Sequence, residues 1–165
     1  MIFEGRCWLF GDNIPTDRLV KSKYVFEPMS EIVKHVLEDL NPAFPLEVRP
    51  GDIVVAGRHF GQSSGRAIAT KALKATGIGC VVAQTFARTF YRNCFEVGLP
   101  ALELPSVGEL VRDGDRVRVD LTAGVLENLT TGARGTAPAA DPFLLSMLEA
   151  GGLIKLAAAR PEIFT

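Results

Sequence analysis

The sequence predicts an α/β fold, because short apolar strands alternate along the chain with segments of helical pattern. Residues 52–56 form an apolar, β-branched run that is typical of a buried strand, and residues 66–75 are rich in the helix formers alanine, lysine and leucine. A second buried strand follows at residues 80–83, so the three segments predict a β–turn–α–β unit. A chain of 165 residues with 47% hydrophobic content buries one core, and we expect a single domain over residues 1–165.

The other elements are predicted from apolar periodicity and from the residues that begin and end helices. Ser30 is a suitable N-cap for a three-turn amphipathic helix that ends at Asn41 and Pro42, and Asp141 with Pro142 begins the last helix. Residues 133–140 carry no pattern and predict a surface loop. We further expect a strand at 2–10, a helix at 86–97 ending at Gly98, a strand at 99–104, and a hairpin formed by 116–121 and 125–129.

Charge and hydropathy exclude two classes of partner. The formal charge is −1, from 18 basic and 19 acidic residues, and no basic block stands out, so we expect no nucleic-acid partner. No apolar run reaches the length of a membrane span, and the first residues lack the pattern of a secretion signal. The expected location is therefore the cytoplasm, without a membrane partner.

The cysteines predict buried thiols and no metal site. Cys7, Cys80 and Cys94 are odd in number and widely spaced, which is typical neither of a disulfide framework nor of a structural zinc site. With only His35 and His59 beside them, the chain has too few ligands for an iron–sulfur or zinc centre. We expect no metal and no cofactor in this chain, so any metal would come from another chain.

The most informative segment is the glycine-rich stretch of residues 57–66, Gly-Arg-His-Phe-Gly-Gln-Ser-Ser-Gly-Arg, which we call the serine loop. It lies between a predicted strand and a predicted helix, where backbone N–H groups at a helix N-terminus attract carboxylate or phosphate. Arg66 adds a guanidinium that can grip a carboxylate, and Ser63 or Ser64 could move a proton. Alternatively, the serines are turn formers or a helix N-cap, and Arg66 is a solvated first-turn residue.

Several motifs in register resemble the 3-isopropylmalate dehydratase small subunits of the aconitase superfamily. The resemblance covers residues 10–156. It is carried by Gly11-Asp12-Asn13-Ile14-Pro15-Thr16-Asp17-Arg18, Gly51-Asp52-Ile53-Val54-Val55-Ala56-Gly57, Phe86-Ala87-Arg88-Thr89-Phe90-Tyr91-Arg92-Asn93, Gly98-Leu99-Pro100, Asn128-Leu129-Thr130-Thr131-Gly132 and Leu148-Glu149-Ala150-Gly151-Gly152-Leu153.

The resemblance implies the swivelling β/β/α domain of the superfamily, which closes over a large subunit that carries a [4Fe–4S] cluster. The implied activity is that of a hydro-lyase subunit, active only in a heterodimer with the large subunit, in leucine and branched-chain amino acid biosynthesis. The substrate would be a branched hydroxy-dicarboxylate, isomerised by dehydration and rehydration. In this chemistry the open iron of the cluster binds the substrate hydroxyl, and a serine of the small subunit removes a proton beside a carboxylate.

The family motif Asn-Phe-Gly-Cys-Gly-Ser-Ser-Arg-Glu-His implies roles for the residues of the serine loop. Aligned without a gap, it places its catalytic serine on Ser64 and its substrate-carboxylate arginine on Arg66. Gln62 and Ser63 then stand where the family has cysteine and glycine, and Gly65 replaces its second serine. We expect Ser64 to be catalytic and Arg66, Ser63, Gly65 and Gln62 to bind substrate.

The alignment leaves departures and one alternative. The pair Ala67 and Ile68 replaces the glutamate and histidine of the family. Moving the two family serines onto Ser63 and Ser64 would displace the arginine by one position, so we prefer the ungapped alignment. Asp12, Asp17 and His59 fit local roles in turns, and Arg88 and Arg92 fit a solvated or interface role.

Substrate choice in the family depends on a short stretch after the first loop, which here is Tyr24-Val25-Phe26-Glu27. Val25 and Phe26 offer apolar surface and no cation, which favours an alkyl branch over a third carboxylate. Alternatively, both residues belong to the core.

Three hypotheses about function follow from the sequence. The first is the catalytic small subunit described above. The second is a catalytically degenerate or divergent partner subunit of an aconitase-type hydro-lyase with a different substrate, of homoaconitase or dimethylmalate type. The third is a standalone phosphate- or nucleotide-binding α/β domain, which the absence of a Walker motif disfavours.

Overall fold

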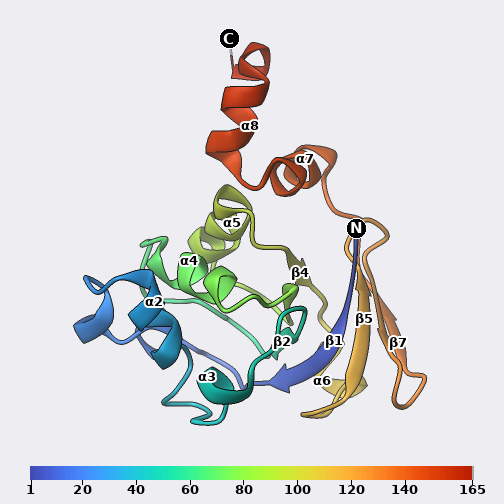
Figure 1. Ribbon diagram of the computed structural model, residues 1–165. Coiled ribbons are helices and arrows are strands. Elements are labelled where there is room, and N and C mark those ends of the chain that lie inside the picture. Colours follow the sequence, from blue (N-terminus) through green and yellow to red (C-terminus); the bar gives the residue numbers. More distant parts are fainter. Residues whose placement is uncertain (165) are drawn as a thin grey trace.

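The computed structural model describes residues 1–164, and its centre is a mixed sheet of seven strands in the order β4-β3-β2-β1-β5-β6-β7 (Figure 1). The strands are β1 (Ile2–Leu9), β2 (Ile53–Ala56), β3 (Cys80–Ala83), β4 (Ala101–Glu103), β5 (Arg116–Asp120), β6 (Val125–Asn128) and β7 (Arg134–Thr136). The α-helices are α1 (Thr16–Leu19), α2 (Met29–Ile32), α3 (Phe44–Glu47), α4 (Ile68–Ala75), α5 (Arg88–Val97), α6 (Val107–Leu110), α7 (Pro142–Ala150) and α8 (Leu153–Ala159). Three 3₁₀ turns complete the described elements: η1 (Ser22–Tyr24), η2 (Val33–His35) and η3 (Pro161–Phe164).

β1 joins two halves of the sheet that differ in pairing. On one side β1, β2, β3 and β4 pair in parallel, with Trp8 opposite Val54 and Val54 opposite Val81. On the other side β1, β5, β6 and β7 pair antiparallel. Every residue of β2 and β3 is buried, as a parallel strand with both faces covered requires, whereas β5 alternates buried and exposed residues. The α/β prediction is confirmed, and its α/β part is the parallel half.

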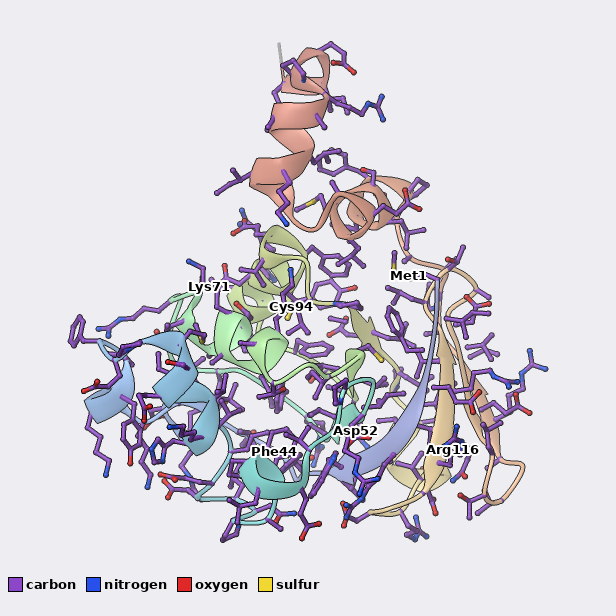
Figure 2. All side chains as sticks on the ribbon, in the orientation of Figure 1. Met1, Phe44, Asp52, Lys71, Cys94 and Arg116 are labelled. Atoms are coloured by element: carbon purple, nitrogen blue, oxygen red, sulfur yellow. The ribbon has the colours of Figure 1, made fainter. Side chains whose placement is uncertain are left out.

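A buried polar contact fixes the start of β2 against β1. The indole N–H of Trp8 donates to Oδ2 of Asp52 at 2.9 Å, and the backbone N–H of Arg49 donates to the same oxygen at 2.9 Å. The Trp8 ring also meets the edge of the Phe44 ring, with centroids 5.2 Å apart. Phe44 and Asp52 are labelled in Figure 2. These contacts hold β2, the strand that leads into the serine loop, in register with β1.

Local signals predicted several elements correctly. The strand at residues 80–83 and the hairpin of β5 and β6 are confirmed. α5 ends at Gly98, whose φ of 77° is the left-handed C-cap that a glycine provides. α7 begins at Pro142, and Oδ1 of Asp141 accepts hydrogen bonds from the backbone N–H groups of Phe143 and Leu144, at 2.8 and 3.4 Å.

Two predictions of secondary structure are wrong in this part of the fold, and the last helix was not predicted. The three-turn helix expected from Ser30 is broken: α2 ends at Ile32, a 3₁₀ turn follows, and Leu37 has a φ of 58°. The cause is tertiary, because the backbone N–H of Leu37 donates to the carbonyl of Leu19 at 3.0 Å while the Leu37 side chain is fully buried. Part of the loop expected at 133–140 forms β7, and α8 has no counterpart in the prediction.

The C-terminal helices stand apart from the sheet. α7 packs on α5, and α8 projects away from the body at the top of Figure 1. Among the described residues no single helix has the length and apolar character needed to cross a bilayer; α7 and α8, which are bent by 88°, meet that criterion only as a pair.

Candidate functional site

The serine loop connects β2 to α4 at the carboxyl ends of the parallel strands, where open α/β sheets place their ligand sites. The loop following β1 and the segment following β3 flank it on either side. Pro15 of the first loop forms a parallel bridge with Gln62, and Phe60 forms one with Phe86. The sheet therefore brings three segments, distant in the sequence, to one edge.

The first half of the loop, residues 57–62, is fixed by hydrogen bonds to both neighbours. Oδ1 of Asp12 accepts from the backbone N–H of Arg58 at 2.8 Å, and Oδ2 accepts from its Nη2 at 3.2 Å. These bonds lower the pKa of the Asp12 carboxyl, the backbone bond having the larger effect. On the other side the backbone N–H of His59 donates to Oγ1 of Thr85 at 2.9 Å. Asp12 and His59 thus have the local roles expected of them.

Aromatic packing also fixes the first half of the loop, residues 57–62. Phe60 is fully buried and meets the rings of Phe86 and Phe90 edge-on, with centroids 6.0 and 5.3 Å away. Gly61 has a φ of 80°, and a Cβ there would overlap the Phe90 ring, so the position requires glycine. Its N–H donates to the carbonyl of Ile14 at 2.8 Å.

Gln62 connects the serine loop to the loop that follows β1. Its side-chain Nε2 donates to the backbone carbonyl of Asn13 at 3.2 Å, and its backbone carbonyl accepts from the N–H of Thr16 at 2.9 Å. The side chain predicted to bind substrate is therefore engaged with the backbone of a neighbouring segment.

The second half, residues 63–66, is the tip of the loop and is more open. Ser63, Gly65 and Arg66 are exposed, and Ser64 is half-buried. Oγ of Ser64 accepts a hydrogen bond from the backbone N–H of Arg66 at 3.2 Å. Nδ2 of Asn93, on α5, donates to the carbonyl of Gly65 at 3.1 Å and attaches the tip to the body.

The helix after the loop begins later than predicted. α4 starts at Ile68, and its N-cap, Ala67, makes no side-chain cap bond. The prediction that the helix starts at Arg66 is therefore wrong, as is the alternative that a serine caps it. Ser63 has a φ of 80°, so the chain is still turning where a helix would require a negative φ. Ser64 forms instead a local turn bond to Arg66.

Two cavities border the tip. One, of about 230 Å³, is lined by Ser63, Ser64 and Arg66 together with Val25. The other, of about 280 Å³, is lined by the segment from Ser63 to Gly65 and by the start of α5. The structure thus brings together Val25, Ser63, Ser64 and Arg66 in one cavity, with Gly65 at the adjoining one.

The first loop contributes residues that the sequence did not predict for this cavity. Thr16, Asp17 and Ser22 line it with the serines. Arg88, for which a solvated or interface role was expected, lines the second cavity with Ser63 and Ser64. The motifs containing Thr16, Asp17 and Arg88 were visible in the sequence, but their meeting at one edge depends on pairing between distant strands.

Phe26 lies away from this cavity. Its side chain is 95% exposed, and it is absent from the lining that includes Val25. The alternative that Phe26 is a core residue is wrong, while Val25 is half-buried and packs against the core.

The described residues offer no metal site. No group of three or more histidine, cysteine, aspartate or glutamate side chains among residues 1–164 could hold a metal ion. The three cysteines are fully buried free thiols, as predicted. Burial is the main cause that raises the pKa of Cys7 to about 12 and that raises the pKa values of Cys80 and Cys94 still further, so none is a thiolate at neutral pH.

Comparisons with known proteins agree on one family. Residues 20–107 match the family model of the aconitase C-terminal domain. The chain is 42% identical over 156 residues to the 3-isopropylmalate dehydratase small subunit of Thermodesulfovibrio yellowstonii, covering 94% of this chain and 93% of that protein. It is 43% identical over 154 residues to the isopropylmalate/citramalate isomerase small subunit of Methanocaldococcus jannaschii, covering 93% and 92%.

A solved structure agrees with these sequence matches. The crystal structure of a 3-isopropylmalate dehydratase from Methanocaldococcus jannaschii superposes with a TM-score of 0.91 at 33% identity, covering 99% of this chain and 97% of that one. The motif resemblance and the swivelling-domain fold class are confirmed. The chain belongs to the 3-isopropylmalate dehydratase small-subunit family, whose members are hydro-lyase subunits.

Proposed function

We propose that this chain is the small subunit of a hydro-lyase that isomerises a branched hydroxy-dicarboxylate by dehydration and rehydration. The printed names of the relatives, 3-isopropylmalate dehydratase and isopropylmalate/citramalate isomerase small subunits, support this class of reaction. The observation that carries the proposal is that Ser64 and Arg66 line one cavity, on a loop fixed from both sides. A base and a cation for a carboxylate are the two groups that proton removal beside a carboxylate requires.

Ser64 is the proposed base. A serine alkoxide forms only where donors and positive charge stabilise it in a site closed to water. The backbone N–H of Arg66 already donates to Oγ of Ser64 at 3.2 Å, and Arg66, a cationic residue, lines the same cavity. Because Ser64 is only half-buried in this chain, the large subunit would complete the exclusion of water.

Arg66 is the proposed anchor for a substrate carboxylate. Its side chain is exposed and forms no ion pair with any residue in the described part of the chain. It is therefore free to make a bidentate contact with a carboxylate. Ser63 and Gly65 border the bound substrate, and Gln62 holds the loop in place through Asn13.

Backbone geometry supports the ungapped alignment with the family motif. In that alignment the family has glycine at the position of Ser63, and Ser63 has the left-handed φ of 80° that glycine adopts most easily. Gly65, which replaces the second family serine, has no positive φ, and a Cβ there would meet only Cγ2 of Thr89 at 3.4 Å. A Cβ therefore fits at Gly65 without overlap, as the second serine of the family motif requires.

The [4Fe–4S] cluster belongs, in this proposal, to the large subunit, where it would supply the Lewis acid for the substrate hydroxyl. This chain supplies the proton acceptor, the carboxylate anchor and part of the substrate wall. Val20, Val25 and Ile68 give that wall an apolar portion for an alkyl branch. Asp17 lines the same cavity and disfavours a third carboxylate.

The test is turnover with a cognate large subunit. The two chains are mixed under anaerobic conditions, and absorbance of the unsaturated acid is followed with isopropylmalate, citramalate, dimethylmalate and homocitrate. We expect turnover of the branched dicarboxylates and little with the tricarboxylate. Absence of turnover with every substrate, in a complex shown to assemble, would instead support the degenerate partner suggested by Gly65, Ala67 and Ile68.

A further inference from the structure

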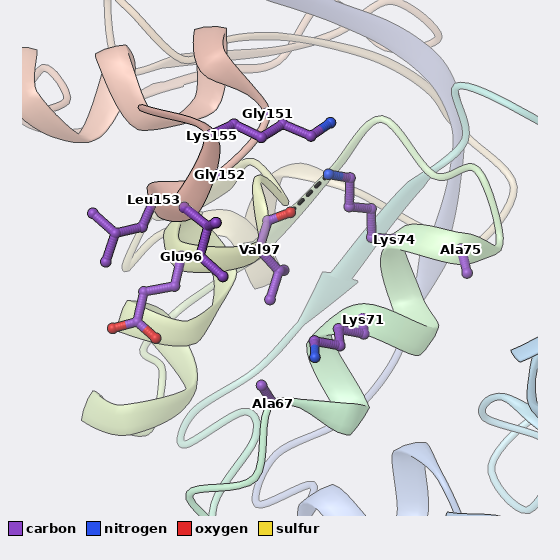
Figure 3. A pocket seen from close by; sticks show the side chains of 11 residues that line it. Ala67, Lys71, Lys74, Ala75, Glu96, Val97, Gly151, Gly152, Leu153 and Lys155 are labelled. Atoms are coloured by element: carbon purple, nitrogen blue, oxygen red, sulfur yellow. Dashed lines mark hydrogen bonds between the residues drawn. The ribbon is translucent and has the colours of Figure 1, made fainter. Parts of the chain in front are cut away.

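A third and larger cavity lies between α4, α5 and α8, and no step of the proposed reaction uses it. It measures about 790 Å³, and Figure 3 shows the side chains that line it. We call it the lysine groove. Its lining consists of Ala67, Lys71, Lys74 and Ala75 from α4 and its N-cap, Glu96 and Val97 from α5, Gly151 and Gly152, and Leu153, Ile154 and Lys155 from α8.

Close contacts between glycines build the groove. Gly98 and Gly152 have positive φ, and a Cβ on Gly98 would lie 2.6 Å from the carbonyl carbon of Gly151. A Cβ on Gly152 would lie 2.6 Å from the carbonyl oxygen of Glu96. The link between α7 and α8 is thus seated directly on the end of α5, which fixes α8 as one wall of the groove.

The lysines of the groove differ from those elsewhere in the chain. The sequence has six lysines. Nζ of Lys21 lies 2.7 Å from Asp39, that of Lys34 lies 2.7 Å from Glu31, and Lys23 sits over the ring of Tyr24.

The other three lysines line the groove, and none of them has a carboxylate partner among the described residues. Nζ of Lys74 donates at 2.7 Å to the carbonyl of Val97, as the dashed line in Figure 3 marks. Burial first, and the charge of Lys155 second, lower the pKa of Lys74. One carboxylate, Glu96, lines the groove against three ammonium groups, so the groove has a net positive charge.

Apolar surface accompanies this charge. The Ile154 side chain is 85% exposed on α8, and Leu153 and Val97 are half-buried beside it. Ile154 therefore adds exposed apolar surface beside the ammonium groups of the groove, and a protein partner can cover both.

The groove begins where the candidate site ends. Ala67 lines the groove, while its neighbours Arg66 and Ile68 line the cavity that contains Ser64. A partner that closes that cavity to water would therefore meet the edge of the groove at Ala67.

We infer that the lysine groove is a docking surface for an acidic, partly apolar segment of the large subunit. This inference rests on the proposed function, because that function requires a large subunit to cover the serine loop. Carboxylates of the partner would pair with Lys71 and Lys155 at the exposed edge, and apolar side chains would cover Ile154.

The test compares two charge-reversed variants of the intact chain. The groove variant carries Lys71→Glu and Lys155→Glu, and leaves Lys74 in its bond to Val97. The control variant carries Lys34→Glu and Arg134→Glu, an equal change of charge at exposed positions away from the groove. Thermal melts establish that both variants fold.

Binding to the cluster-bearing large subunit is measured anaerobically at low and high salt. We expect the groove variant to raise Kd at least about tenfold and the control variant about twofold or less, with the difference shrinking at high salt. Excess large subunit restores turnover of the groove variant, because Ser64 and Arg66 are unchanged.

Other results would overturn the inference. If the groove variant binds like the unaltered chain while turnover proceeds, the docking surface is elsewhere and the proposed function stands. If the only effect of the groove substitutions is the loss of self-association of the isolated chain, measured by sedimentation equilibrium, the occupant of the groove is a second copy of this chain. If the unaltered chain neither binds a large subunit nor supports turnover, both proposals fail together.

Discussion

The two halves of the serine loop are held in different ways. Residues 57–62 are fixed by Asp12 and Thr85 on either side and by the Phe60 ring beneath. Residues 63–66 make one internal bond, from Arg66 to Ser64, and one bond to the body through Asn93. This difference indicates that the anchored half, residues 57–62, determines where the tip lies. The tip, residues 63–66, keeps its hydroxyls and guanidinium available for a ligand. Substitutions within residues 57–62 should therefore mainly lower stability, and substitutions within residues 63–66 should mainly change activity.

The largest effect on stability is expected at Phe60. The change Phe60→Ala removes a fully buried ring that packs against Phe86 and Phe90, and should lower the free energy of unfolding by about 3–5 kcal/mol. Urea unfolding of the isolated chain measures the loss. A loss below about 1 kcal/mol would mean that the rings do not anchor the loop.

A smaller effect, of opposite sign, is expected at the tip. Ser63→Gly relieves the left-handed backbone at a φ of 80°, offset by the greater freedom of glycine in the unfolded chain, so we expect a gain of up to about 1 kcal/mol. Combining it with Gly65→Ser restores the two residues of the family motif, and the complex should retain or gain activity. Destabilisation by Ser63→Gly would argue that the Ser63 side chain has a structural role.

The smallest effect is expected from Asp12, which is exposed, and its sign depends on pH. Its pKa in the folded chain is lowered by the bonds from Arg58, so the ionised carboxylate stabilises the fold above its ordinary pKa of 3.8. This contribution is lost as the pH falls through the lowered pKa. Melting temperatures of the unaltered chain and Asp12→Asn should therefore differ at pH 7 and converge below pH 3.8. A difference that stays constant between pH 7 and pH 3 would contradict this account.

The sequence predicted those elements whose signals are local. The cap formed by Asp141 and Pro142, the left-handed Gly98 and the alternation of β5 each act within a few residues. The broken helix near Leu37 was missed because its cause is a hydrogen bond to Leu19, which lies in another segment.

Two of the missed elements, β7 and α8, also depend on distant contacts. The residues of β7 were predicted to form a loop because they show no strand pattern. Gly135 has no side chain to contribute to such a pattern, yet a Cβ there would overlap Leu110. α7 ends at its C-cap Gly151, but the next residue, Gly152, with a φ of 124°, is the N-cap of a further helix, α8.

In the candidate site, too, some features were predicted from local sequence and others depend on contacts between distant segments. The serine loop and the residues it offers were evident from the order of glycine, serine and arginine. The presence of Asp17 and Arg88 beside the tip, and the absence of Phe26, depend on how β1, β2 and β3 align and on how the chain turns after α1. The lysine groove was invisible in the sequence, because it requires α8 to be seated on the end of α5.

The most direct test of the distinction between anchor and tip is Ser64→Ala in the complex with the large subunit. Turnover and the melting temperature of the isolated chain are measured on the same preparation. We predict that kcat falls at least about 100-fold, as expected when a general base is lost, while the melting temperature stays within about 2 °C because the half-buried hydroxyl makes only the local bond to Arg66. An active complex whose kcat is unchanged by Ser64→Ala would show that Ser64 is not the base.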